Sequence, residues 1–194
     1  MAFNYSPKIV TEGLVFAVDA ANRKSYPGSG TNCTDIVGVS DGVLTNGVGY
    51  SLDNGGSFIF DGTDDYIDID TVPQINNPLT ICAFVNADTV PASTSETLVI
   101  YGPTTNGQDN WFGITSNSRL EVFFTEASDV NNFVLRSASN TLTCDGTTWH
   151  YVACTIDGAT AKIYIDGVES GSTTAAFTIG GWYGESDADR KSVV

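Results

Sequence analysis

The residues of this chain with the most obvious capacity for chemistry are three carboxylates near its C-terminal end, Glu185, Asp187 and Asp189. Two carboxylates held about 5 Å apart can hydrolyse a glycosidic bond with retention, one as nucleophile and the other as acid. The three stand among Gly and Ser residues, which predict a loop and not a rigid strand. We therefore expect no hydrolytic site, and the chain is predicted not to be an enzyme.

The only histidine, His150, follows Trp149 at the start of a predicted strand. A serine-type triad built on a nucleophile elbow needs a Gly-x-Ser-x-Gly turn, and the sequence contains none. His150 is therefore expected to be structural. No glycine-rich loop opens a helix, so a phosphate-binding loop is not predicted either.

The net charge of the chain limits the classes of molecule that it can bind. The net charge is −15 over 194 residues, and 11 Asp or Glu residues but no Lys or Arg lie between Lys24 and Arg119. Such a field repels the phosphates of nucleic acids and anionic lipid head groups. No apolar run approaches the roughly 20 residues of a membrane span. We predict no nucleic-acid or membrane partner, whereas divalent cations and basic surfaces are favoured.

No apolar leader follows Met1, so the chain as written is expected to stay in the cytosol. The cysteines are Cys33, Cys82, Cys144 and Cys154, without a Cys-x-x-Cys pair. With a single histidine, this spacing does not predict a zinc site. Cys82 and Cys154 fall inside predicted strands as small core residues, and free thiols are expected.

The elements that must position these residues are strands. Residues 149–167 predict a hairpin, with β-branched and aromatic residues over 151–156, a turn at Asp157-Gly158 and a return strand over 161–165. Asp166-Gly167 supplies a second turn. Abundant Gly, Phe and Tyr with a single Met also disfavour a helical protein.

Other alternating segments between turn signals predict further strands, and no window shows helical periodicity. Their spacing predicts an all-β protein, an antiparallel two-sheet β-sandwich, as a single domain over residues 1–194. The predicted strands fall within 9–19, 42–50 and 57–69, and near 80–85, 98–101, 111–115, 120–125, 133–136 and 175–179.

The hairpin from Trp149-His150 to Asp166-Gly167 resembles the core hairpin of laminin-G-like, concanavalin-A-like jelly-roll domains. Residues 42–50 and 57–69 resemble further segments of this family. The resemblance implies a concanavalin-A-like jelly roll. Residues 13–31 are similar to the opening of lectin-like domains in virion proteins of tailed bacteriophages. Those relatives often carry Trp where Cys33 stands, so this loop is expected to pack differently.

Two departures from related proteins bear on chemistry. Laminarinase-type hydrolases of this fold carry a Glu-x-Asp-x-x-Glu strand, and residues 185–189 lack its second Glu. Pentraxins join two comparable strands by a disulfide, but here Cys154 falls one residue later. A one-residue shift turns a strand side chain to the opposite face.

The family normally places a further strand after residues 178–184, beside the N-terminal one, whereas this chain ends at Val194. The last strand is then either missing or only begun at 191–194. A missing strand would open a sheet edge to another chain. The open edge predicts assembly with another chain. A shortened gene product would explain the missing strand equally well.

Resemblance to pentraxins also suggests calcium. Gln108-Asp109-Asn110 looks like their Asp-Asn ligand pair, and Glu185-Ser186-Asp187 looks like their second acidic loop. Calcium takes six to eight oxygen ligands, and Asp109, Asn110, Glu185 and Asp187 could supply four side chains. Asp64-Asp65 is an independent pair. Alternatively, these residues only shape turns.

Aromatic residues near the same loops, Trp182, Tyr183 and Trp111, could stack on sugar rings. For Trp111, at the start of a predicted strand, core packing is the favoured alternative. The sequence thus predicts a non-enzymatic structural and adhesive protein of a phage virion, a capsid decoration or a tail or fibre component, assembled in the host cytoplasm. Its expected partners are other virion proteins, further copies of itself and cell-surface glycans. The alternatives are a free-standing carbohydrate-binding module and a degenerate glycoside hydrolase.

Overall fold

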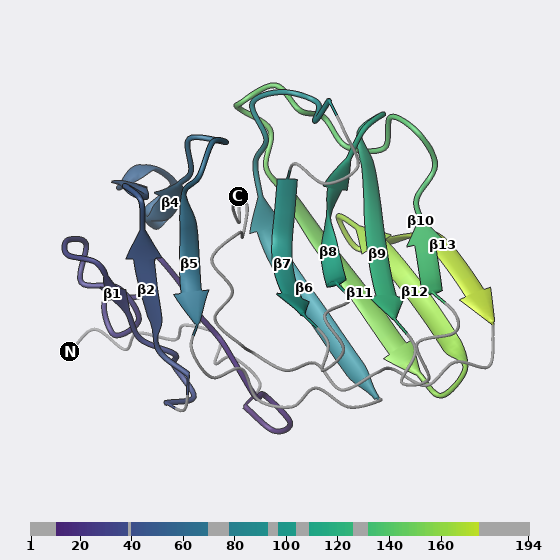
Figure 1. Cartoon of the computed structure of the whole chain (residues 1–194), viewed down its shortest axis with the longest axis horizontal. Coiled ribbons are helices and arrows are strands. Elements are labelled where there is room, and N and C mark those ends of the chain that lie inside the picture. Colours follow the sequence, from purple (N-terminus) through teal and green to yellow (C-terminus); the bar gives the residue numbers. More distant parts are fainter. Residues whose placement is uncertain are drawn as a thin grey trace, which may run out of the picture.

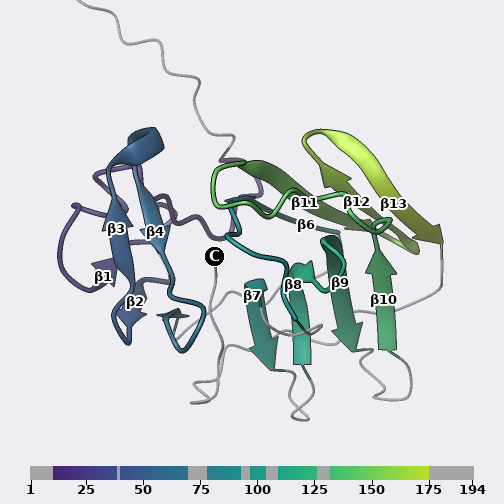
Figure 2. The ribbon, with the colours of Figure 1, turned by 90° about the horizontal axis from the view of Figure 1, so that it is seen from above.

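Two four-stranded antiparallel sheets form the main body of the protein and lie as separate layers (Figures 1 and 2). The computed structural model describes residues 11–38, 40–69, 78–92, 97–103, 109–125 and 132–174. Their regular elements are all strands apart from one short 3-10 helix, which confirms the predicted all-β, antiparallel two-sheet β-sandwich. One sheet has the order β10-β9-β8-β7, with β7 (Thr97–Pro103), β8 (Asp109–Thr115), β9 (Arg119–Thr125) and β10 (Asn132–Arg136). The other has the order β13-β12-β11-β6, with β6 (Leu79–Val85), β11 (His150–Asp157), β12 (Thr160–Ile165) and β13 (Val168–Thr174).

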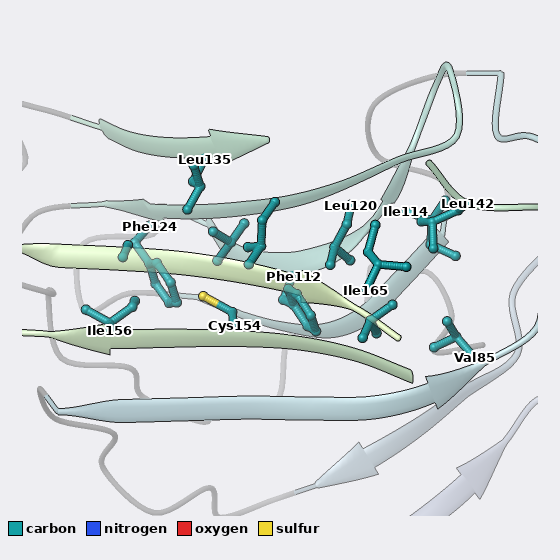
Figure 3. Close-up of a cluster of buried hydrophobic side chains, with 14 of the residues drawn as sticks. Val85, Phe112, Ile114, Leu120, Phe124, Leu135, Leu142, Cys154, Ile156 and Ile165 are labelled. Carbon is teal, nitrogen blue, oxygen red and sulfur yellow. The ribbon is translucent and has the colours of Figure 1, made fainter. Parts of the chain in front are cut away.

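The core lies between these two sheets, because alternate residues of each strand point to the same side. Phe112, Leu120 and Val122 of one sheet meet Val152 and Ile163 of the other, and all five are fully buried. Figure 3 shows the side chains of this cluster between the two layers. Burying one such side chain contributes about 1.5–3 kcal/mol. The intervening residues of every strand must therefore face outward.

The β11–β12 hairpin forms as its sequence predicts, and a second tight turn carries the chain into β13. Asp166 and Gly167 both have positive φ, 51° and 80°. Two consecutive positive φ values match the twist of the flanking strands, and Asp-Gly is a preferred pair for this geometry. The Asp166 side chain also accepts a hydrogen bond from the Tyr151 amide at 2.9 Å, which ties the turn to β11.

The N-terminal part forms two smaller sheets around a second hydrophobic cluster, and Figure 1 shows it beside the main body. Tyr26, Cys33 and Leu44 are its buried members. Among the described strands, no hydrogen-bonded pairing joins these sheets to β6–β13. Within the described ranges, no helix has the length and apolar character needed to cross a membrane. The elements here are β1 (Asn32–Cys33), β2 (Gly42–Thr45), β3 (Gly49–Ser51), the short 3-10 helix η1 (Asp53–Gly55), β4 (Ser57–Ile59) and β5 (Tyr66–Ile69).

The strand predicted within residues 9–19 is wrong for its described part. Residues 14–19 are not in a strand, and their backbone bonds go elsewhere. The Ala17 amide donates to the Asp35 side chain at 2.9 Å, and the Ala17 carbonyl accepts from the Ile36 amide at 2.8 Å. The backbone groups of Ala17 are therefore hydrogen-bonded to a neighbouring loop and not to a paired strand.

The four cysteines are free, as predicted, but Cys82 is not a core residue. Cys154 is buried and lies opposite Ile81, whereas Cys82 lies opposite Ala153 and is exposed on the outer face of β6. The offset of one residue places the two sulfur atoms on opposite faces of the sheet. Burial raises the pKa of the Cys154 thiol to about 12.

The remaining strand predictions agree with the described chain, except at its end. β2, β3, β4, β5 and β6 to β12 occupy the predicted segments. β1 and β13 are strands that the sequence did not predict. β1 has only two residues, and the β13 sequence Val-Glu-Ser-Gly-Ser-Thr-Thr is mostly polar and shows no alternation. The strand predicted near 175–179 and the short terminal strand lie outside the described residues.

The loop before β11 is organised by one exposed carboxylate. Asp145 Oδ1 accepts hydrogen bonds from the amides of Thr147 and Thr148 at 2.8 and 2.7 Å. These bonds, the Thr147 amide first, lower the pKa of Asp145 to about 2. Their strength depends on the charge of the carboxylate, because ionised acceptors bind more strongly than neutral ones.

We predict that Asp145→Ala lowers the melting temperature at neutral pH and that its deficit shrinks in acid. A carboxyl whose folded pKa lies below its unfolded value of about 3.9 contributes stability above that value and loses it as the pH falls. Thermal unfolding of wild type and variant between pH 6 and pH 2 should converge between about pH 4 and about pH 2. Asp157→Ala, at the exposed far end of β11, is the control. A deficit that stays constant over this interval contradicts the prediction.

Candidate functional site

An aromatic pair stands on the outer face of the β7–β10 sheet. Trp111 of β8 pairs with Phe123 of β9 in the register of the sheet. Their rings are parallel within 9° with centroids 5.9 Å apart. Both side chains are partly exposed, and the residues on either side of them, such as Phe112 and Val122, point into the core. This face therefore presents apolar ring surface to solvent.

An ion pair lies next to the aromatic pair on the same face. Glu121 is two residues before Phe123 and has only 1% of its side chain exposed. Arg136 of β10 lies opposite Glu121 and engages both carboxylate oxygens, through Nε to Oε2 and through Nη2 to Oε1 at 3.1 Å. The Arg136 side chain remains 47% exposed. A buried carboxylate is costly unless it is paired, so the guanidinium is held over Glu121.

The structure describes only part of the site that the sequence suggests. Asp109 is the first residue of β8 and Asn110 the second, so they begin a strand and do not lie in a loop. Asn110 is fully buried. Trp111 lies on the outer face and not in the core. The other predicted site residues, Trp182, Tyr183, Glu185 and Asp187, lie outside the described residues.

Three carboxylates do come together in the turn between β4 and β5. Asp61, Asp64 and Asp65 each place a carboxylate oxygen within 4.8 Å of the other two. Asp65 Oδ2 also accepts from the Asp61 amide at 3.0 Å, and Asp61 Oδ1 accepts from the Thr63 amide at 2.7 Å. The bond from Thr63 is the main cause that lowers the pKa of Asp61. The group shapes the turn and also gathers negative charge.

His150 has a structural position, as predicted. Its Nε2 accepts a hydrogen bond from the Thr143 amide at 2.9 Å, so in this state the proton resides on Nδ1. Nδ1 then donates to Asp166 Oδ2 at 2.8 Å. This bond is the main cause that lowers the pKa of Asp166. Both ring nitrogens are thus occupied in joining two loops.

A second aromatic pair lies on the outer face of the opposite sheet. Phe84 of β6 pairs with Tyr151 of β11, and the ring centroids are 5.0 Å apart at an interplanar angle of 49°. Phe84 is 69% exposed. The rings are tilted and, among the described strands of this sheet, are not the register neighbours of an ion pair. Exposed aromatic surface therefore occurs on both sheets, but only the Trp111 pair adjoins a fixed guanidinium.

Phe123, Glu121 and Arg136 belong to this surface although sequence reasoning did not single them out. Each is an ordinary strand residue, and their proximity arises only from the pairing of β8, β9 and β10. The available signal was the alternation in residues 119–125, which places 119, 121 and 123 on one face. A charged residue at 121 between apolar neighbours marks the outward face.

The two antiparallel sheets packed face to face define a β-sandwich, an architecture that lectin domains share. The chain belongs to the concanavalin A-like lectin/glucanases superfamily, whose family model matches residues 61–187. This match confirms the concanavalin-A-like, laminin-G-like part of the sequence prediction. No match was found among curated protein sequences.

Two solved structures are similar to this chain. One is domain 4 of AbnA, a GH43 extracellular arabinanase from Geobacillus stearothermophilus, in complex with arabinotriose. It is 16% identical, has a TM-score of 0.53 and covers 78% of this chain and 74% of its own. The other is an S-layer domain-containing protein from Clostridium thermocellum, 25% identical, with a TM-score of 0.47 and coverages of 78% and 69%. The arabinanase domain supports the fold.

Proposed function

We propose that this protein is a non-enzymatic glycan-binding domain that acts through the outer face of the β7–β10 sheet. The observation that carries the proposal is the parallel, partly exposed pair of Trp111 and Phe123. Sugar rings present apolar C–H faces, and aromatic side chains offer matching flat surface at a low cost in conformational entropy. Family membership is consistent with this, because the superfamily includes lectins.

The absence of catalysis is part of the same proposal. Retaining hydrolysis needs a nucleophile and an acid about 5 Å apart. The carboxylate beside the aromatic pair, Glu121, has both oxygens engaged by Arg136. It is therefore poorly placed to act as a nucleophile or to donate a proton. The domain binds its ligand and releases it unchanged.

The first test is a glycan array carrying neutral oligosaccharides of glucose, galactose, mannose and arabinose, followed by calorimetric titration. Trp111→Ala should weaken binding about tenfold, since an aromatic contact contributes on the order of 1.4 kcal/mol. Phe84→Ala, which removes a ring from the opposite sheet, is the matched control and should leave the affinity unchanged. An equal loss of affinity in both variants would contradict a site on the β7–β10 sheet. If the wild type binds no glycan, the proposed function is refuted.

The state of the ligand after binding tests the non-enzymatic part. The bound oligosaccharide should be recovered intact after prolonged incubation. Hydrolysis of laminarin-like glucans that disappears in Glu185→Gln would overturn it.

We place this binding domain on a phage particle, as a capsid decoration or a tail or fibre component. Support for this location comes from the resemblance of residues 13–31 to lectin-like domains of virion proteins. Its partners there are other virion proteins and further copies of the chain, and its glycan belongs to the host surface. A free-standing carbohydrate-binding module would use the same face without assembly.

The location predicts that the chain remains attached to purified particles. Mass spectrometry of particles separated on a density gradient should detect its peptides at a constant ratio to the major capsid protein. Peptides found only in the soluble fraction of the lysate would favour the free-standing module.

Calcium is the cofactor we propose, and the support is the gathering of carboxylates at Asp61, Asp64 and Asp65. Calcium prefers oxygen ligands of this kind. Asp109, Asn110, Glu185 and Asp187 form the other candidate ligand set.

Calcium at about one hundred times its Kd should stabilise the protein by about 2.7 kcal/mol, which a rise in melting temperature would measure. Asp64→Asn should abolish this rise if the turn binds the ion, and Asp109→Asn should abolish it if the other set does. Asp157→Asn is the charge-matched control. No rise at about 1 mM calcium would refute both sites.

A further inference from the structure

We propose that Arg136, held in place by Glu121, is the hydrogen-bonding half of the glycan site and that the site accepts neutral sugars. The inference rests on the proposed function, since it assigns a second recognition group beside Trp111 and Phe123. Each ring covers one face of a sugar, whereas hydroxyl groups around the sugar edge need polar partners. Arg136 is positioned to be such a partner.

The ion pair uses only one side of the guanidinium. Nε and Nη2 donate to the two oxygens of Glu121. Arginine has five N–H donors, so Nη1 keeps two that point away from the carboxylate. Within the described part of the chain, Nη1 makes no hydrogen bond. These two donors are available to adjacent hydroxyl oxygens of one sugar.

The orientation of the guanidinium is fixed before any ligand arrives. Glu121 is buried and cannot leave its partner without leaving an unpaired charge, so the pairing persists. The backbone below is constrained too. A Cβ at Gly171 of β13 would lie 2.8 Å from the Arg136 carbonyl oxygen, so β13 packs directly against β10 at this residue. A donor fixed in this way loses little entropy on binding.

Arg136 and the aromatic pair are close enough to share one ligand. Phe123 lies opposite Val134, and Arg136 is two residues further along β10 on the same face. Such diagonal neighbours are about 7–8 Å apart. The residue of β8 opposite Glu121 is Gly113, which adds no side chain beside the ion pair. One sugar residue can therefore contact Phe123 and reach Nη1.

Charge selects the class of ligand. Glu121 neutralises Arg136, so the site has no net positive charge to attract an acidic sugar. The protein as a whole carries −15, which repels anionic glycans. The site therefore favours neutral oligosaccharides with adjacent hydroxyl groups over uronic acid or sialic acid glycans.

The test compares Arg136→Lys and Arg136→Ala with the wild type on an array of neutral oligosaccharides and their uronic acid counterparts. Lysine keeps the charge but has neither the planar fork nor Nη1. Both variants should therefore bind neutral glycans about tenfold more weakly, the loss expected for one or two hydrogen bonds. Arg119→Lys is the matched control, because Arg119 lies on the same face as the first residue of β9 and donates to Ser139. Its affinity should be unchanged.

The outcomes separate this inference from the proposed function. If Trp111→Ala weakens binding and both Arg136 variants bind like the wild type, the inference fails and the function stands. If Arg136→Lys binds like the wild type and Arg136→Ala does not, the positive charge is used and not the planar guanidinium. That result would also overturn the inference. Tighter binding of uronic acid glycans would refute the neutral ligand class. If the wild type binds no glycan, the function itself fails. Melting temperatures of all variants identify any loss that comes from unfolding.

Discussion

Side-chain alternation in the paired strands is the constraint on which this structure depends. Phe112, Leu120 and Val122 face inward and pack in the core, so the residues one position away along each strand face outward. Trp111, Glu121 and Phe123 are brought together on the outer face by that demand and by the register of β8 and β9. A shift of one residue would turn Glu121 away from Arg136 and into the apolar interior, and would turn the core side chains outward. The packing of the interior therefore defines the exterior surface.

Burial of Glu121 gives the outer surface its rigidity. A carboxylate that is 1% exposed needs its cation, and that cation comes from the neighbouring strand. The pair joins β9 and β10 through side chains in addition to their backbone hydrogen bonds. Such a joint contributes little net stability compared with apolar packing, and its effect is to restrict geometry. A surface for recognition benefits from this restriction more than from stability.

Much of the fold could be predicted because turns and alternation are local signals. The Asp157-Gly158 and Asp166-Gly167 turns lie at the predicted positions, and so do the strands β11 and β12 that they border. Residues 14–19 have the composition of a strand, yet Ala17 makes its backbone hydrogen bonds with Asp35 and Ile36, a pairing that no local signal predicts. β13 was not predicted, because its mostly polar residues show no alternation of apolar and polar positions. The ion pair of Glu121 and Arg136 could not be predicted, since it joins residues 15 positions apart whose contact depends on strand register.

The register of β6 and β11 has a chemical consequence of its own. Cys82 and Cys154 lie on neighbouring strands, near enough along the backbone for a covalent cross-link, but their side chains leave the sheet in opposite directions. Oxidants cannot join them without breaking the pairing of the strands. β6 and β11 are thus joined by backbone pairing and side-chain packing, and oxidising conditions add no cross-link between these two cysteines.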